Sequence, residues 1–250
     1  MKTDKPVLPV ILASPDSIFS LAASLAARMN SLKLSQARVN VIRDGDKVFW
    51  SNFDLALMSD KTEMMAEYGT ILRDWSKFYK KYFGITADFS TIRIPAKVID
   101  LDRLIVIVEG ISINQVYETG KKNFGSWKWC SADIESNMRP EERGQVKATY
   151  AIWVRNGQEA DDDLHDMSAH MIAGQKIDTE NLLERLVHGF KYWSETKTHL
   201  DIKTVTLCAS SRCSVGYVPC VGRCGRGDVD VNYYGVRRRP PGLRARRAGR

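Results

Sequence analysis

The chain has 250 residues, of which 44% are hydrophobic and 27% are charged. This composition is typical of a globular protein and excludes a disordered or collagen-like chain, while the length allows one large domain or two small ones. No apolar run approaches the roughly 20 residues that a membrane-spanning helix needs. Prolines interrupt the short apolar run near the N-terminus. We therefore expect no secretory signal and take the cytoplasm as the default location.

The positive charge lies almost entirely near the C-terminus. The formal net charge of the whole chain is +7. Residues 201–250 contain 11 Lys and Arg against three Asp, a balance of +8, whereas the first 200 residues contain 26 basic and 27 acidic residues, a balance of −1. Four of the five cysteines also follow residue 207. We therefore expect the functional features of this chain in its last fifty residues.

Hydrophobic periodicity predicts two helices and a hairpin in the first hundred residues. Ser14–Asn30 is predicted to be a helix, and Arg38–Trp50 a β-hairpin that turns at an Asp-Gly pair. Asp60–Phe83 is predicted to be a longer helix that stops at Gly84. We expect its apolar stripe to face the core and not a cofactor. The stripe consists of Met64, Tyr68, Ile71, Trp75, Phe78 and Tyr82.

From residue 98 onward, strands and helices follow one another without a repeated βαβ pattern. Strands are predicted at Leu104–Val108, Tyr150–Arg155 and Thr204–Leu207, each of which is rich in apolar residues. Helices are predicted at Ser112–Asn123 and Thr179–Ser194. This order favours an α+β class.

One cluster of polar residues would suit an enzyme. His165 and His170 lie close to the aspartate run Asp161–Asp163, and these residue types bind metal ions. Their spacing matches neither an EF-hand nor a helix-borne zinc site, and no phosphate-binding loop or nucleophile elbow is present. We therefore predict no catalysis, no metal and no cofactor. A metal-dependent enzyme that uses this loop stays as an alternative.

The clustered cysteines do not have the spacing of a zinc site. Cys208, Cys213, Cys220 and Cys224 follow the pattern C-x4-C-x6-C-x3-C, whereas structural zinc sites favour C-x2-C pairs. Nothing else in the chain suggests a secreted, disulfide-bonded protein. We predict neither zinc nor disulfides here.

The stretch from Cys208 to Arg250 uses a restricted set of amino acids. It contains no Lys, Glu, Gln, Met or Trp, although about ten would be expected from their frequency upstream. Selection for positive charge alone would use Lys as well as Arg. All residues present are reached by changing the first two bases of an asparagine codon that ends in a pyrimidine, and the five missing ones are not. A GC-rich or frame-shifted 3′ end would also give an Arg-, Pro- and Gly-rich tail without Lys.

This coding rule is that of diversity-generating retroelements, in which template adenines are replaced at random during reverse transcription. The sequence resembles the variable proteins of these elements over roughly Val98–Arg250. It departs from them at Arg223 and Tyr233, where such regions usually keep Trp. The resemblance rests on Leu104–Tyr117, Trp127–Cys130, Tyr150–Arg155, Leu182–Leu186, His199–Asp201, Val205–Cys208 and Gly242–Arg246.

The resemblance implies a C-type-lectin-like domain over residues 98–250, preceded by an N-terminal helical and β-hairpin region over residues 1–97. It also implies a diversified segment at about residues 208–247. The implied function is non-catalytic binding of a protein or other macromolecular ligand, whose identity the sequence does not reveal.

Apolar and polar residues alternate between positions 228 and 232, which fits a protein that presents a variable binding surface on a stable core. Val229 and Val231 are predicted to face the core, while Asp228, Asp230 and Asn232 face solvent. A fold tolerates random residues only where the side chains leave the core, because a buried misfit commonly costs about 1–3 kcal/mol.

Valines are predicted to anchor the rest of the segment, at Val215, Val218 and Val221. The outward residues are rich in Tyr, Ser, Gly, Asn and Arg, which form adaptable binding surfaces. The predicted ligand contacts are Cys213, Tyr217, Cys220, Gly222, Cys224, Arg226, Asp228, Asp230, Asn232, Tyr234, Arg237 and Arg239.

The basic tail offers an alternative function. The arginines between Arg237 and Arg247 form short clusters of the kind that bind the phosphate backbone of nucleic acids. In that case, affinity should fall steeply with salt and disappear when residues 236–250 are removed.

Overall fold

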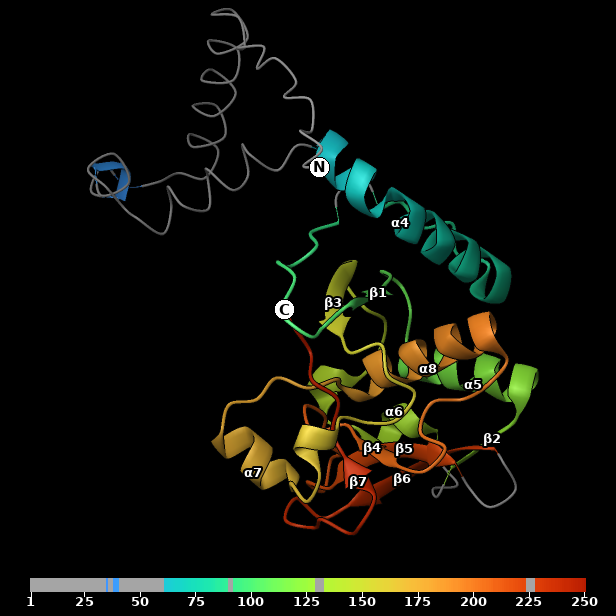
Figure 1. Cartoon of the computed structure of the whole chain (residues 1–250), viewed down its shortest axis with the longest axis vertical. Helices are drawn as coiled ribbons and strands as arrows, with labels where there is room; N and C mark the ends of the chain where they lie inside the picture. Colours follow the sequence, from blue (N-terminus) through green and yellow to red (C-terminus); the bar gives the residue numbers. More distant parts are fainter. Residues whose placement is uncertain (1–34, 36–37, 41–60, 90–91, 129–132, 224–227) are drawn as a thin grey trace, which may run out of the picture. The chain divides into compact units, whose positions relative to one another are not determined.

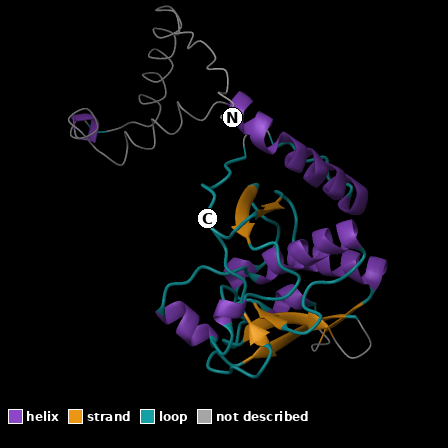
Figure 2. Cartoon of the chain, viewed as in Figure 1, coloured by secondary structure: helices purple, strands orange, loops and turns teal. Residues whose placement is uncertain are grey.

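The computed structural model describes residues 35, 38–40, 61–89, 92–128, 133–223 and 228–250, and it has the predicted α+β class (Figures 1 and 2). The chain divides into two compact units, Met1–Met64 and Met65–Arg250. The elements, in chain order, are α4 (Lys61–Phe83), β1 (Arg103–Ile107), α5 (Ile113–Phe124), β2 (Ser126–Lys128), α6 (Ile134–Asn137), β3 (Tyr150–Val154), α7 (Ala169–Gly174), α8 (Leu182–Thr196), β4 (Val205–Leu207), β5 (Val218–Arg223), β6 (Val229–Tyr234) and β7 (Leu243–Arg244), with 3₁₀ turns at Pro140–Glu142 and Asp162–Leu164.

Few of the predictions for the N-terminal region fall on described residues. The helix expected at Ser14–Asn30 lies outside them, as does most of the expected hairpin. Residues 38–40 are helical, so the prediction of a β-strand at these residues is wrong. Ser35 explains the helix, because its Oγ accepts a hydrogen bond from the backbone N–H of Arg38 at 3.2 Å.

Helix α4 confirms the predicted long helix, and from Met65 onward it belongs to the larger compact unit. The indole of Trp75 donates to the carbonyl of Leu104 at 3.2 Å, and the hydroxyl of Tyr79 donates to the carbonyl of Val106 at 2.6 Å. Both carbonyls belong to β1. The boundary expected near residue 97 therefore falls inside this unit, after a helix that is already bonded to it.

The buried face of α4 is rotated slightly from the predicted stripe. Trp75 and Phe78 are buried as expected, but Ile71 is 39% exposed. Leu72 and Tyr79 are buried instead. The core face thus follows an i, i+3, i+7 pattern that starts at residue 72. Gly84 ends the helix with φ +70°, a conformation that suits glycine.

Strands β1 and β3 form a two-stranded antiparallel sheet with Ile105 opposite Ile152. The last four residues of each strand are buried, which confirms the fully apolar strands that the sequence predicts. Helix α5 begins as predicted, because the side chain of Ser112 accepts a hydrogen bond from the backbone N–H of Gln115. Helix α8 begins at Leu182, three residues later than predicted, because Asn181 and Glu184 form a capping box there.

The second sheet has five strands in the order β2-β6-β5-β4-β7. Strand β2 runs parallel to β6 and β7 runs parallel to β4, while β5 is antiparallel to both of its neighbours. Helices α5 and α8 lie over one face of this sheet (Figure 1). None of the described helices is both long enough and apolar enough to cross a membrane.

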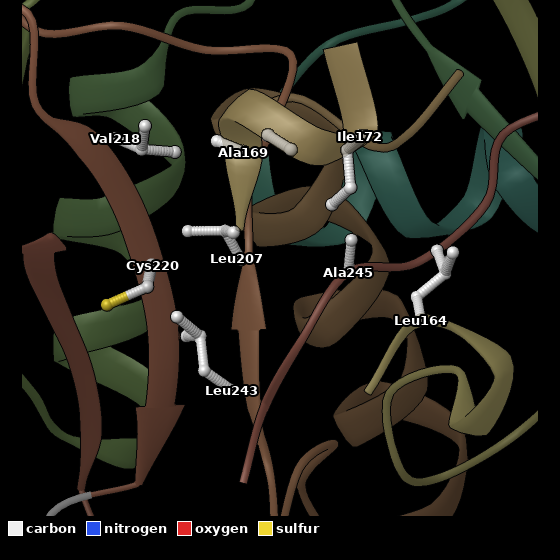
Figure 3. Close-up of a cluster of buried hydrophobic side chains, with 9 residues drawn as sticks. Leu164, Ala169, Ile172, Leu207, Val218, Cys220, Leu243 and Ala245 are labelled. Carbon is white, nitrogen blue, oxygen red and sulfur yellow. The ribbon is translucent and has the colours of Figure 1, made fainter. Parts of the chain in front are cut away.

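A hydrophobic cluster covers part of the other face (Figure 3). It joins side chains of β4, β5 and β7 to the short helix α7, which the sequence did not reveal. Ile172 of α7 and Val218 of β5 are both buried in it. The buried members are Leu164, Ala169, Ile172, Leu207, Ala209, Val218, Cys220, Leu243 and Ala245.

The C-terminal segment is an integral part of this unit. Strand β7 pairs with β4, and Trp153 and Gly249 exchange backbone hydrogen bonds of 3.0 and 2.8 Å. The N–H of Glu180 donates to the carbonyl of Arg246 at 3.0 Å. The last eight residues therefore contribute backbone pairing and buried side chains to the fold.

A candidate ligand-binding surface

Two depressions in the surface lie side by side and share Tyr217 and Tyr233. The first has a volume of about 760 Å³ and the second about 550 Å³. The first depression is lined by Tyr217, Tyr233, Tyr234, Gly235, Arg237, Arg238, Arg239 and Pro240. The second depression is lined by Asn137, Cys213, Ser214, Val215, Tyr217, Asn232 and Tyr233. Every lining residue except Asn137 thus belongs to the codon-restricted stretch.

Strand β6 alternates between two faces, but its polar side chains are half-buried and not turned fully to solvent as predicted. Val231 is completely buried and pairs with the buried Val221 of β5. Asp230 and Asn232 lie on the opposite face and are half-buried. Val229 is also only half-buried, because it lies at the start of β6, next to the short edge strand β2. Asp228, just before the strand, is half-buried too.

The loop that carries Tyr217 is fixed at both ends. The N–H of Cys213 donates to the carbonyl of Tyr217 at 2.8 Å, and the N–H of Tyr217 donates to Cys213 Sγ at 3.1 Å. The N–H of Ser214 donates to the carbonyl of Asn137, at the end of α6, at 2.7 Å. Gly216 completes the turn with φ +89°. The loop therefore presents Tyr217, which is 53% exposed, from a buried anchor.

A second turn presents the arginines of the first depression. The N–H of Arg238 donates to the carbonyl of Gly235 at 2.8 Å, which closes the turn. Val236 packs against the hydrophobic cluster, and its carbonyl accepts from the N–H of His170 at 2.9 Å. Arg237, next along the chain, is exposed. The half-buried side chain of Val236 and the backbone of α7 therefore hold the turn that carries the arginines.

The structure places the twelve predicted contacts unequally. Tyr217, Arg237 and Arg239 are exposed, and Asp228, Asp230, Asn232 and Tyr234 are half-buried. Cys224 and Arg226 lie outside the described residues. Lining residues that the prediction omitted are Asn137, Ser214, Val215, Tyr233, Gly235, Arg238 and Pro240.

Three predicted contacts are corrected because they are buried, although Cys213 forms part of the wall of the second depression. Cys213 and Cys220 are 4% and 1% exposed. Gly222 is buried, and a β-carbon there would lie 2.9 Å from a methyl group of Val205. Val215, predicted to be a buried anchor, is 78% exposed at the tip of the Tyr217 loop. A valine in a surface turn follows no period, so its burial could not be inferred from sequence.

The described cysteines behave as small apolar residues. Cys208, Cys213 and Cys220 are buried and carry free thiols. Burial raises the pKa of Cys220 to about 12, which keeps its thiol neutral and unreactive. Within the described part of the chain, no three His, Cys, Asp or Glu residues come together as a metal site.

Four arginines of the tail are paired with carboxylates of the body. Arg244 contacts Asp162 at 2.7 Å and Arg247 contacts Asp163 at 2.8 Å. Arg250 contacts Glu184 and Arg246 contacts Asp201, at 2.8 and 2.7 Å. Three of the six arginines between Arg237 and Arg247, the segment proposed for nucleic-acid binding, are therefore engaged within the protein.

Asp201 forms the buried centre of these contacts. Its side chain is completely buried and accepts from Arg185 at 2.6 Å as well as from Arg246. Burial alone would raise the pKa of Asp201, but the two guanidinium charges hold it well below its usual range. Arg246 also donates to the carbonyls of Gly157 and Gln158 at 2.9 and 2.8 Å. This arginine, whose exposed fraction is 1%, is structural.

The same buried region holds a carboxyl–imidazole pair that the sequence did not reveal. Glu180 Oε1 lies 2.8 Å from His188 Nδ1, and both side chains are fully buried. Burial raises the pKa of Glu180 to about 7 and lowers the pKa of His188. His188 belongs to α8, and Glu180 precedes this helix and donates its N–H to the carbonyl of Arg246. Neither residue lines either depression.

The aspartates of the acidic loop, Asp161–Asp163, form contacts that stabilise the fold. Arg155 and Arg247 both contact Asp163, and hydrogen bonding from Arg155 lowers the pKa of this aspartate. Asp161 accepts a hydrogen bond from the backbone N–H of Arg247 at 2.7 Å. The Nδ1 atom of His165 lies 2.6 Å from the carbonyl oxygen of Asp162. The residues of this loop, which the alternative hypothesis of a metal-dependent enzyme would use, thus contact arginine side chains and backbone groups.

Comparison of the chain with known proteins gave no match among protein-family models, curated proteins or solved structures.

Proposed function

We propose that this chain is a ligand-binding display protein whose C-terminal region is diversified by a retroelement. The observation that carries the proposal is the lining of the two depressions. Of its residues, all but Asn137 lie in the stretch that lacks Lys, Glu, Gln, Met and Trp. The same stretch supplies buried residues, including Val218, Val221 and Val231, to the core. The side chains that line the depressions can thus be exchanged while the buried residues of the same stretch keep the fold.

The composition of the surface also supports recognition. Tyr217, Tyr233 and Tyr234 offer large aromatic areas with little conformational entropy to lose on binding. Asn232 and Arg237 offer adaptable hydrogen bonding. The side chains rise from two loops and a strand end held by a sheet, an arrangement common in binding proteins.

The proposal includes a C-type-lectin-like fold for Val98–Arg250. Its support is the α+β order over this range and a C-terminal segment that returns to pair with β3 and β4. Helix α4 is an addition on the N-terminal side of this range.

Nucleic-acid binding by the tail has weaker support. Arg244, Arg246 and Arg247 bind Asp162, Asp201 and Asp163, so their charge is already neutralised. Deletion of residues 236–250 would also remove β7, and loss of binding in such a variant would report unfolding.

A codon-restricted library tests the display function. Codons with any first two bases and a pyrimidine third base would replace Tyr217, Asn232, Tyr233, Arg237 and Arg239 in phage-displayed protein. We expect most variants to stay folded, and selection against several unrelated purified proteins to yield binders of about micromolar affinity or better. The measurement combines protease resistance of the pool with the affinities of selected clones.

A matched library provides the control. The same codons would replace five buried positions of the stretch, Val218, Cys220, Val221, Val231 and Leu243. Most of these variants should be cleaved by protease, because buried misfits cost several kcal/mol. Equal losses in the two libraries, or no binder from the surface library, would contradict the proposal.

A further inference from the structure

We propose that the two depressions bind an acidic segment of a partner protein that also carries an apolar side chain. This inference rests on the proposed function and specifies the class of ligand for this version of the surface. Three arginines, Arg237–Arg239, define the first part of the site, and Val215 defines the second.

The arginines of the first depression differ from the other arginines of the tail. Among the described residues, no carboxylate pairs with Arg237, Arg238 or Arg239, whereas Arg244, Arg246, Arg247 and Arg250 all have carboxylate partners. The guanidinium of Arg239 lies 3.5 Å from the carbonyl of Asp166, a long contact with an uncharged group. Three adjacent positive charges are therefore left for a ligand.

The turn that carries these arginines has a backbone held by hydrogen bonds. Around Gly235, the ring of Tyr217 and the stem of Arg238 lie so close that a β-carbon would touch both, at 3.8 and 3.7 Å. The turn itself is held by the half-buried Val236, which packs against the hydrophobic cluster, and by the N–H of His170. A guanidinium in such a site matches a carboxylate in bidentate geometry. Aspartate or glutamate side chains of a partner are thus the complementary groups.

The second depression is complementary to a different chemical group, an apolar side chain. Val215 is 78% exposed and lies beside Tyr217 and Tyr233, so an apolar side chain placed here would cover apolar area. Asn137 and Asn232 add amide groups that pair with the backbone of an extended segment. A ligand that spans both depressions therefore combines carboxylates with an apolar residue, as a protein segment does.

A nucleic acid fits the same surface less well. Nucleic-acid sites typically neutralise many phosphates along a continuous basic track, with about 6–10 contacts in strong binders. Here the next arginines along the chain, Arg244 and Arg247, are already paired.

A random peptide library tests the ligand class with the protein unchanged. We would select phage-displayed peptides on the full-length protein at physiological salt and sequence the enriched pool. The expected result is enrichment of Asp and Glu together with apolar residues. Binding of the enriched peptides should weaken at least tenfold in the triple variant Arg237→Gln, Arg238→Gln, Arg239→Gln.

Control experiments distinguish the effect of the three arginines from a general loss of charge, and the acidic ligand class from the display function. The triple variant Lys121→Gln, Lys122→Gln, Lys147→Gln loses the same charge at exposed positions elsewhere and should bind normally. Peptides without acidic residues that need Tyr217 but not the arginines would overturn the acidic class and leave the display function standing. No enrichment, or tighter binding of a labelled single-stranded oligonucleotide than of any peptide, would also overturn it.

Discussion

Replacing Arg246 with Met is expected to destabilise the protein by about 3–5 kcal/mol, because it leaves the buried carboxylate of Asp201 with one guanidinium in place of two. The substitution also removes the donors to the carbonyls of Gly157 and Gln158. Methionine matches the arginine stem in shape, so the loss reports the charge and its hydrogen bonds. Urea unfolding followed by tryptophan fluorescence measures the change.

Arg244→Met is the matched control in the same tail. The partner of Arg244 is Asp162, whose side chain is 88% exposed. Water can replace this contact, so we expect a change of less than about 1 kcal/mol. Similar small changes for Arg246 and Arg244 would contradict a structural role for the C-terminal segment and favour a solvated basic arm.

Replacing Trp75 with Ala is expected to destabilise the protein by about 3–5 kcal/mol. The indole is 1% exposed and packs against Phe78 and Tyr79, with ring centroids 5.4 and 5.7 Å away. Its N–H also bonds to the carbonyl of Leu104 in β1. The loss should appear in a single unfolding transition, because α4 and β1 belong to the same compact unit.

Ile71→Ala, one turn earlier on the same helix, is the control for this prediction. Ile71 is 39% exposed, so its truncation should cost less than about 1 kcal/mol. If Trp75→Ala behaved like Ile71→Ala, or if α4 melted in a separate transition, the helix would belong to an independent N-terminal region, as the sequence had suggested.

The regular elements of the larger unit were predictable because their apolar residues recur with a clear period. The strands at 104–108 and 150–155 contain unbroken apolar runs, and Ser112 marks the start of α5. Helix α7 has only six residues and α6 only four, and neither is long enough to show a period. Both nevertheless matter, since α6 holds the Tyr217 loop and α7 holds the Arg238 turn.

The surface was only partly predictable. Alternation along residues 228–232 correctly assigned Val231 to the core, but Asp230 and Asn232, predicted to face solvent, are half-buried on the opposite face. It could not show that Cys213 and Cys220 are buried, because cysteine occurs both in cores and in reactive sites. Nor could it show which arginines are paired, because Arg246 and Asp201 are brought together only by the return of the chain.

We propose that adenine-directed diversification acts on the residues around the two depressions and leaves the buried residues beneath them unchanged. The most direct measurement is the DNA sequence next to this gene. We expect a reverse-transcriptase gene and a near-copy of the 3′ coding region that differs from it chiefly at adenines, with the differing codons at positions such as Tyr217, Asn232 and Arg237. The codons of Val231, Leu243 and Arg246 should be unchanged. Absence of such a copy, or differences concentrated in these three buried codons, would contradict the account.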